Sequence, residues 1–193
     1  INLGTLAVDG TVALTTNGTG NATLVNDAGL NFAASTVGGN LIATATTGNM
    51  EDAGVLTIAG TSSFTTSADN ATITLNNANA FTGAVALNTT GSTGHATVVD
   101  ASGLNLGAST VGGNLSATAT TGNMEDSGVL TIAGTSSFTT SADNATITLN
   151  NANAFTGTVG VNTTGSSGNV TVVDASGLNL GASTVGGNLS ATA

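Results

Sequence analysis

The chain has 193 residues, among them 38 Thr, 28 Gly, 23 Asn and 17 Ser, and it has no Lys, Arg, Pro, Cys, Trp or Tyr. Ten acidic residues without a permanent cation give a net charge of −10, which excludes nucleic acid as a partner because no side chain can neutralise phosphate. The absence of Cys excludes disulfides and thiolate metal sites, and without an apolar run of about 18 residues we expect no membrane insertion of this segment.

The composition nevertheless predicts a folded chain. High charge and many Gly, Ser and Asn residues are typical of disorder, but 39% of the residues are hydrophobic and the mean hydropathy is +0.31. The apolar residues are mostly Ala, Val, Leu and Ile in short runs with β-branched neighbours. We therefore expect an all-β fold.

Internal repeats determine the domain organisation. The string STVGGNL begins at Ser35, Ser109 and Ser183, which gives a period of 74, and the two full copies differ at 8 of 74 positions. Such near-identity indicates one continuous β-solenoid segment, 1–193, of a longer chain rather than separate functional domains. The divisions are a partial repeat 1–34, repeats 35–108 and 109–182, and a partial repeat 183–193.

In chain order, each repeat alternates corners and short strands. Clusters of Gly, Asn and Asp predict corners at 37–40, 47–49 and 68–70. Apolar residues two apart predict strands containing Leu56 and Ile58, Ile73 and Leu75, and Ala96 and Val98, with an extra strand at 85–87. The Thr residues between the apolar ones, Thr57, Thr74 and Thr97, are expected to face outward.

The spacing of inward residues predicts stacked coils. The column Leu41, Ile58, Leu75, Val98, Leu115 has spacings of 17, 17, 23 and 17, and a second column, Phe64, Phe81, Leu104, has spacings of 17 and 23. This pattern predicts a parallel β-solenoid (β-helix) with about four coils per 74-residue repeat. At about 4.8 Å per coil, each repeat would add roughly 19 Å. A β-sandwich repeat leaves the 17-residue spacing unexplained.

His95 is the only histidine and the first candidate for chemistry. Its equivalents are Asn169 in the next copy and Asn21 in the earlier one. The position therefore requires a polar residue, not an imidazole. We expect no catalytic, cofactor-binding or metal-binding residue here, and no cofactor.

The acidic residues recur with the repeat. Asp52 and Asp69 are separated by the same step of 17 as the inward columns, and so are Asp126 and Asp143, so the expected register would stack each pair on neighbouring coils. Ca²⁺ could relieve the repulsion between stacked carboxylates. Because the Gly-Gly-x-Gly-x-Asp pattern of calcium-binding β-rolls is absent, we favour solvated turn acids, a reading that also covers Asp100 and Asp174.

The sequence also argues against an enzyme. A pair of carboxylates could in principle hydrolyse glycosides, but the chain has no Arg, Lys, Trp or Tyr to hold a sugar, and no base stands beside a Ser nucleophile. Ice binding is a further alternative, raised by Thr44-Ala45-Thr46 and Thr72-Ile73-Thr74. The irregular recurrence of this motif makes it the less favoured one.

Three segments carry a resemblance to a known family: Val-Gly-Gly-Asn-Leu at 37–41, Gly-Val-Leu-Thr-Ile-Ala-Gly at 54–60, and Ala-Thr-Ile-Thr-Leu-Asn-Asn-Ala-Asn at 71–79. They resemble the repeat regions of filamentous-haemagglutinin-type adhesins, which are bacterial exoproteins secreted by the two-partner route and include biofilm matrix adhesins. The resemblance implies a right-handed β-helical shaft that folds outside the cell. It carries over no functional residue.

The expected function is therefore a structural repeat shaft of a large secreted bacterial surface adhesin or biofilm fibre, which projects or links cells without catalysis. The alternative is a self-assembling extracellular filament subunit or a polysaccharide-binding repeat module. The expected partners are extracellular polysaccharide, other cells or copies of the chain itself. The expected location is extracellular, at the cell surface or in a biofilm matrix.

Overall fold

The computed structural model describes all residues, 1–193, and every regular element is a β-strand. The all-β prediction is therefore confirmed. No helix that could cross a membrane is present. The strands are β1 (Asn2–Leu6), β2 (Thr11–Val12), β3 (Ala22–Asn26), β4 (Leu30–Phe32), β5 (Ser35–Val37), β6 (Leu41–Ala45), β7 (Met50–Asp52), β8 (Leu56–Ile58), β9 (Ser62–Asp69), β10 (Ile73–Phe81), β11 (Val85–Thr90), β12 (Ala96–Asp100), β13 (Leu104–Leu106), β14 (Ser109–Val111), β15 (Leu115–Ala119), β16 (Met124–Asp126), β17 (Leu130–Ile132), β18 (Ser136–Asp143), β19 (Ile147–Phe155), β20 (Val159–Thr164), β21 (Val170–Asp174) and β22 (Leu189–Thr192).

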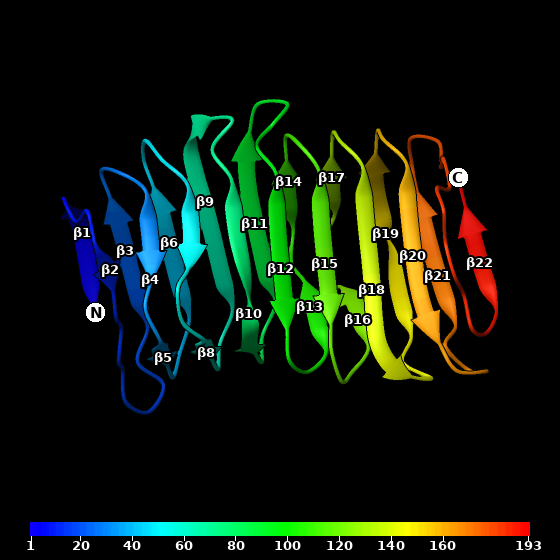
Figure 1. Ribbon diagram of the computed structural model, residues 1–193, viewed down its shortest axis with the longest axis horizontal. Helices are drawn as coiled ribbons and strands as arrows, with labels where there is room; N and C mark the ends of the chain where they lie inside the picture. Colours follow the sequence, from blue (N-terminus) through cyan, green and yellow to red (C-terminus); the bar gives the residue numbers. More distant parts are fainter.

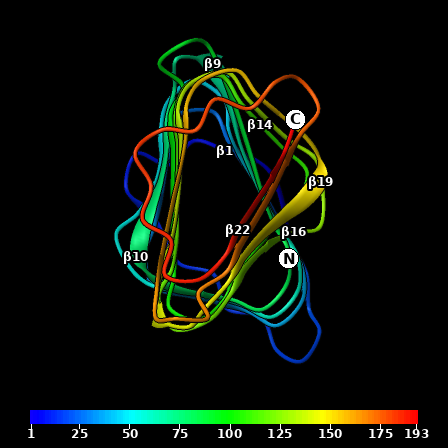
Figure 2. The ribbon, with the colours of Figure 1, turned by 90° about the vertical axis from the view of Figure 1, so that its right-hand side faces the viewer.

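The strands wind into a parallel β-solenoid of about 9 turns, each of about 21 residues. In Figure 1 the strands of the near face run downward and those of the far face run upward while the chain advances from left to right, which is a right-handed winding. Figure 2 looks along the rod and shows the successive turns superimposed on one elongated outline. The expected solenoid is thus confirmed.

Hydrogen-bonded pairing joins the strands into one set of twelve and one of ten. In Figure 1, strands β12, β15 and β18 of the second set lie on the near side of the rod, and β9 and β11 of the first set lie on the far side. Pairing places Leu41 beside Ser62 on the next turn, and Ser62 beside Val85. In the ten-stranded sheet, Ile73 lies beside Ala96 on the next turn. The mean turn is therefore about 21 residues long, and the 17-residue spacing expected from the inward columns is wrong. Apolar residues alternate along every strand, so several registers look alike in the sequence.

The 74-residue repeat makes three and a half turns. Pairing carries Ala22 to Leu41, Leu41 to Ser62 and Ser62 to Val85, which is three turns. Ala96, the equivalent of Ala22 in the next copy, lies half a turn beyond Val85, in the other sheet. Equivalent strands such as β9 and β18 consequently lie in opposite sheets. The repeat adds about 17 Å to the rod, less than the sequence-based expectation.

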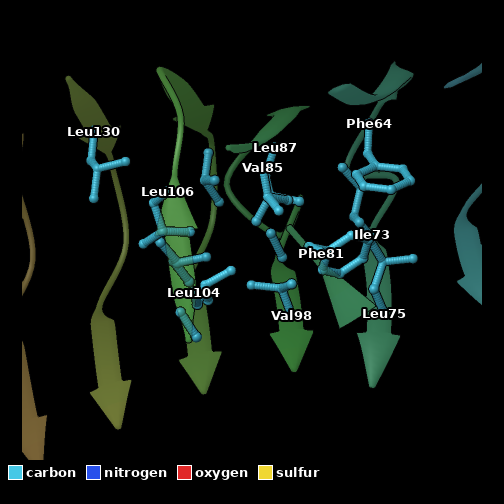
Figure 3. Close-up of a cluster of buried hydrophobic side chains, with 14 of the residues drawn as sticks. Phe64, Ile73, Leu75, Phe81, Val85, Leu87, Val98, Leu104, Leu106 and Leu130 are labelled. Atoms are coloured by element: carbon cyan, nitrogen blue, oxygen red, sulfur yellow. The ribbon is translucent and has the colours of Figure 1, made fainter. Parts of the chain in front are cut away.

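A single hydrophobic core of 37 residues runs along the axis. Figure 3 shows side chains from both sheets pointing into it, among them Leu75, Leu87 and Val98. Phe64 contacts Phe81 edge to face, with ring centroids 5.9 Å apart. This contact crosses the interior between the two sheets, whereas Phe64 stacks along the rod on Leu87. The expected stack of Phe64, Phe81 and Leu104 is therefore wrong.

The outer surface follows the predictions, and so do most corners: residues 38–40 and 47–49 lie between strands, whereas Ala68 and Asp69 still belong to strand β9. Asn70 has a φ of 65° and Asn144 one of 64°, as expected of a left-handed corner residue. Thr57 is exposed, and Thr74 and Thr97 are partly exposed. The segment at 85–87 lies in strand β11.

Candidate functional site

The ten acidic residues divide into two groups that the sequence does not distinguish. Six are exposed and four are buried, so the expectation of solvated turn acids is wrong for four of them. The buried acids form two pairs, and the members of each pair are equivalent residues of successive copies. The exposed acids are Asp9, Asp27, Glu51, Asp69, Glu125 and Asp143, and the buried acids are Asp52, Asp100, Asp126 and Asp174.

Asp52 lies at a corner of the solenoid, where strand β10 changes its hydrogen-bonding partner on the preceding turn. Strand β10 pairs first with β7 and then with β8, and between these pairings its backbone turns. Asp52 Oδ1 accepts the Asn76 N–H at 3.0 Å, while Oδ2 accepts the Asn77 N–H at 3.2 Å and Asn79 Nδ2 at 2.7 Å. Asp126 repeats this arrangement in the next copy. Both oxygens of each carboxylate thus accept hydrogen bonds that hold the corner together.

Asp100 is buried in a different way. Its Oδ1 accepts the Ser102 N–H and Ser102 hydroxyl, each at 3.0 Å, whereas Oδ2 is buried without a hydrogen-bond partner. Burial raises the pKa of Asp100 above its ordinary value, against the lowering effect of hydrogen bonds from Ser102 and the Phe81 N–H. Asp174 has the same bonds from Ser176 and the same unpartnered Oδ2.

The predicted stacking of Asp52 on Asp69 does not occur. Asp52 pairs with Phe32, and Asp69, in the opposite sheet, pairs with Thr90. In the next copy Asp126 pairs with Leu106 and Asp143 with Thr164. The physical reason is the turn length, which is about 21 residues and therefore longer than the sequence pattern suggests. The structure therefore does not bring together the carboxylates on which the calcium alternative depended. No three His, Asp or Glu side chains lie close enough together to hold a metal ion.

His95 lies at a corner where one polar side chain accepts a main-chain N–H from the next turn, an arrangement that recurs in each copy and is called the corner ladder below. Its Nδ1 accepts the N–H of Asn114, 2.8 Å away on the next turn. Asn21 Oδ1 accepts the Asn40 N–H in the same way, and Asn169 Oδ1 accepts the Asn188 N–H. The imidazole thus serves here as a hydrogen-bond acceptor, the same task that an Asn performs at the equivalent positions. This explains why the position requires a polar residue.

Two surface notches occupy equivalent places in two successive copies. The first has a volume of about 360 Å³ and the second about 270 Å³. Every residue of the second notch has its counterpart, one repeat earlier, in the lining of the first. The residues of the second notch are Thr82, Gly103, Leu104, Asn105, Asn123 and Glu125.

The notches present the carboxylates of Glu51 and Glu125 to solvent, whereas Asn31 and Asn105 are partly buried. Asn105 pairs with Glu125 on the neighbouring turn, as Asn31 pairs with Glu51. Because the repeat makes a half-integral number of turns, Glu51 and Glu125 lie in opposite sheets. Sequence reasoning missed this pairing, since Asn105 and Glu125 are far apart along the chain and only the observed register brings them together.

The outward Thr residues do not form a regular array. Thr74 pairs with Thr97 on one side but with Glu51 on the other. Thr44 pairs with Thr65 and also with Val25. The flat Thr-x-Thr face that ice binding requires is interrupted at both predicted motifs.

The comparison with protein families finds the same 74-residue period as the sequence repeats. A family described as repeats of unknown function, DUF5649, matches residues 19–88, 93–162 and 167–193. The chain belongs to this family. The three matches begin at equivalent residues of successive copies, so each DUF5649 unit recurs every three and a half turns of the solenoid. No curated protein and no solved structure matches the chain.

Proposed function

We propose that this DUF5649 chain is a structural repeat shaft of a large secreted bacterial surface adhesin or biofilm fibre, without catalytic activity. The observation that carries the proposal is the unbroken stacking across the repeat boundary. Strand β12 of repeat 35–108 pairs along its whole length with β15 of repeat 109–182, from Ala96 on Leu115 to Asp100 on Ala119. The core passes through this boundary without interruption.

Such stacking makes length a property that duplication can extend. In a solenoid each turn contacts its neighbours alone, so an added repeat brings its own core and the same interface. The two copies differ at 8 of 74 positions, and most of those positions preserve the inward or outward character of the side chain. Added copies would therefore lengthen the rod without changing its cross-section.

The outer surface suits an extracellular spacer. It bears Thr, Ser and Asn with scattered acids, and the absence of Lys and Arg leaves no cleavage site for trypsin-like proteases. The resemblance of the Val-Gly-Gly-Asn-Leu segment at 37–41 to haemagglutinin-type adhesin repeats supports secretion and a location at the cell surface or in a biofilm matrix. On this proposal the partners are other cells or matrix polymers, held at a distance by the shaft.

The recurring notches favour a second candidate, a polysaccharide-binding repeat module. An exposed carboxylate such as that of Glu125 can accept hydrogen bonds from sugar hydroxyls, and the equivalent notch at Glu51 lies in the opposite sheet. A rod with such sites on both faces would cross-link polymer chains. No aromatic side chain lines either notch, so stacking on a sugar ring does not contribute.

Replacement of the shaft tests the proposal. In cells that display the full-length protein, residues 35–182 are exchanged for an unrelated solenoid of equal length, and cell–cell adhesion is measured. A passive shaft predicts that adhesion is retained after the exchange and lost when 35–182 is simply deleted. Retention of adhesion after the deletion would contradict the proposal.

A binding measurement distinguishes the polysaccharide-binding module from the passive shaft. The chain and its Glu51→Gln, Glu125→Gln double variant are titrated with extracellular polysaccharide from the same cells. Binding that the double variant loses, together with loss of adhesion after the exchange, would support the polysaccharide-binding module. Equal and negligible binding by both chains would support the passive shaft.

A further inference from the structure

The buried acid Asp100 has a direct counterpart of different chemistry in the same chain. Asn26 stands one repeat earlier and is fully buried, as Asp100 is. Asn26 pairs with Ala45, and Asp100 pairs with Ala119, the equivalent of Ala45. The two side chains therefore occupy the same corner in two successive copies.

Asn26 shows what this corner requires. Its Oδ1 accepts the Val8 N–H at 3.0 Å, and its Nδ2 donates to the carbonyl oxygens of Val8 at 2.9 Å and Gly29 at 2.6 Å. One side-chain atom thus accepts from the main chain and the other donates to main-chain carbonyls. An ionised carboxylate accepts on both oxygens and has no proton to donate.

In Asp100 only the accepting half of this pattern is satisfied. Oδ1 accepts from Ser102 on the same turn, whereas Oδ2 is buried without a partner. Gly103, the equivalent of Gly29, follows at the same distance along the chain. A buried charge without a partner loses its hydration without compensation, and a carboxyl group avoids most of that cost by taking up a proton.

No nearby charge offers another solution. The strands stacked on β12 are β10 and β15, and neither contains an ionisable residue; nor does β13, which follows the corner. On β16, the next strand beyond β13, Glu125 is exposed and Asp126 is held by the amides of β19. The chain has no Lys or Arg that could serve as a counter-ion.

We propose that Asp100 is a proton-binding site of the folded rod, where a protonated Oδ2 donates its hydrogen to the main-chain carbonyl of Gly103. At a pH between the ordinary aspartate pKa and the raised pKa of folded Asp100, folding then takes up a proton from water, and unfolding releases it. Asp174 has the same unpartnered oxygen in the next copy. The rod is thereby more stable in mildly acidic surroundings than at neutral pH, a property that does not depend on the adhesin proposal.

The sign follows from linkage. The pKa of folded Asp100 is raised above its ordinary value by burial, so the folded state binds this proton more tightly than the unfolded chain. The stability contributed by the site is complete in acid. It is lost as the pH rises from the ordinary aspartate range through the raised pKa.

The test uses three variants of the whole chain, with thermal unfolding followed from about pH 3 to about pH 8. Asp100→Asn supplies the donor permanently and should raise the midpoint at about pH 8, with little effect at about pH 3. Asn26→Asp should do the reverse, lowering the midpoint at about pH 8 and recovering in acid. Asp69→Asn removes an exposed charge and controls for the loss of one negative charge, so its difference from the native chain at about pH 8 should be much smaller than that of Asp100→Asn.

A spectroscopic measurement reports the proton directly. The ¹³C carboxyl resonance of Asp100, assigned through its loss in Asp100→Asn, should titrate at a pH above the ordinary aspartate range. An Asp100 resonance that titrates within or below the ordinary aspartate range would overturn the proposal. So would an Asp100→Asn difference that is the same at every pH.

Discussion

Asn79 Nδ2 donates to Asp52 Oδ2 across 2.7 Å, and Asn79 Oδ1 accepts the N–H of Leu56 at 2.8 Å. Two turns of the solenoid are tied together at this corner by one buried amide. Asn153 and Asp126 repeat the tie in the next copy, where Asn153 also accepts the N–H of Leu130. The carboxylate and the amide therefore act as structural parts of the corner.

The first prediction concerns this tie. Asn79→Ala leaves the Leu56 N–H unpaired and removes one donor from Asp52, so we expect unfolding to require about 3 kcal/mol less free energy. Asn76→Ala is the matched control, because Asn76 is exposed and bonds to Asp52 only through its backbone. Chemical denaturation of both variants measures the difference, and equal losses would show that the side chain of Asn79 is not the tie.

The second prediction concerns two buried serines. Ser62 Oγ has no hydrogen-bond partner, whereas Ser109 Oγ donates to the Gly107 carbonyl and accepts the Leu87 N–H. Ser62→Ala removes an unpaired hydroxyl and should stabilise the rod by up to about 1 kcal/mol. Ser109→Ala leaves two main-chain groups unpaired and should cost about 2 kcal/mol. Thermal unfolding of the two variants should shift in opposite directions; shifts of the same sign would contradict the assignment.

The third prediction concerns His95. Asn at this position keeps an acceptor for the Asn114 N–H, as Asn169 does for Asn188. His95→Asn should therefore leave the free energy of unfolding within about 0.5 kcal/mol of the native value. His95→Ala removes the acceptor and should cost about 1 kcal/mol. A large loss in the Asn variant would indicate a role for the imidazole that the ladder does not explain.

Sequence reasoning was right about the periodic features and wrong about register. Alternation in segments such as Leu56-Thr57-Ile58 predicts a strand and its inward face, and the recurrence of STVGGNL predicts stacked copies. The turn length depends instead on which apolar residue of one coil lies beside which of the next. Ile58 is a plausible neighbour of Leu41 by hydrophobicity, yet the partner of Leu41 is Ser62.

The same limit applies to the candidate site. Asp52 and Asp69 look alike in sequence, because both precede short corner segments. Their burial differs because β10 bends around Asp52, while Asp69 ends a strand at an exposed corner. Only the three-dimensional register separates the structural carboxylates from the surface ones.

The fourth prediction tests that register. Thr74 and Thr97 lie side by side on adjacent turns, whereas Thr57 pairs with Ala80, which lies beyond the bend of β10 from Thr74. Spin labels on Cys at 74 and 97 should show strong dipolar broadening, and labels at 57 and 74 should not. Broadening in the 57 and 74 pair alone would restore the 17-residue turn.

The most direct test of the shaft itself is its length as a function of copy number. Chains with two, four and six copies of residues 35–108 are imaged by electron microscopy. A parallel solenoid predicts rods of constant width that lengthen by about 17 Å for each added copy. Separate globules on a string, or particles that widen without lengthening, would contradict the account.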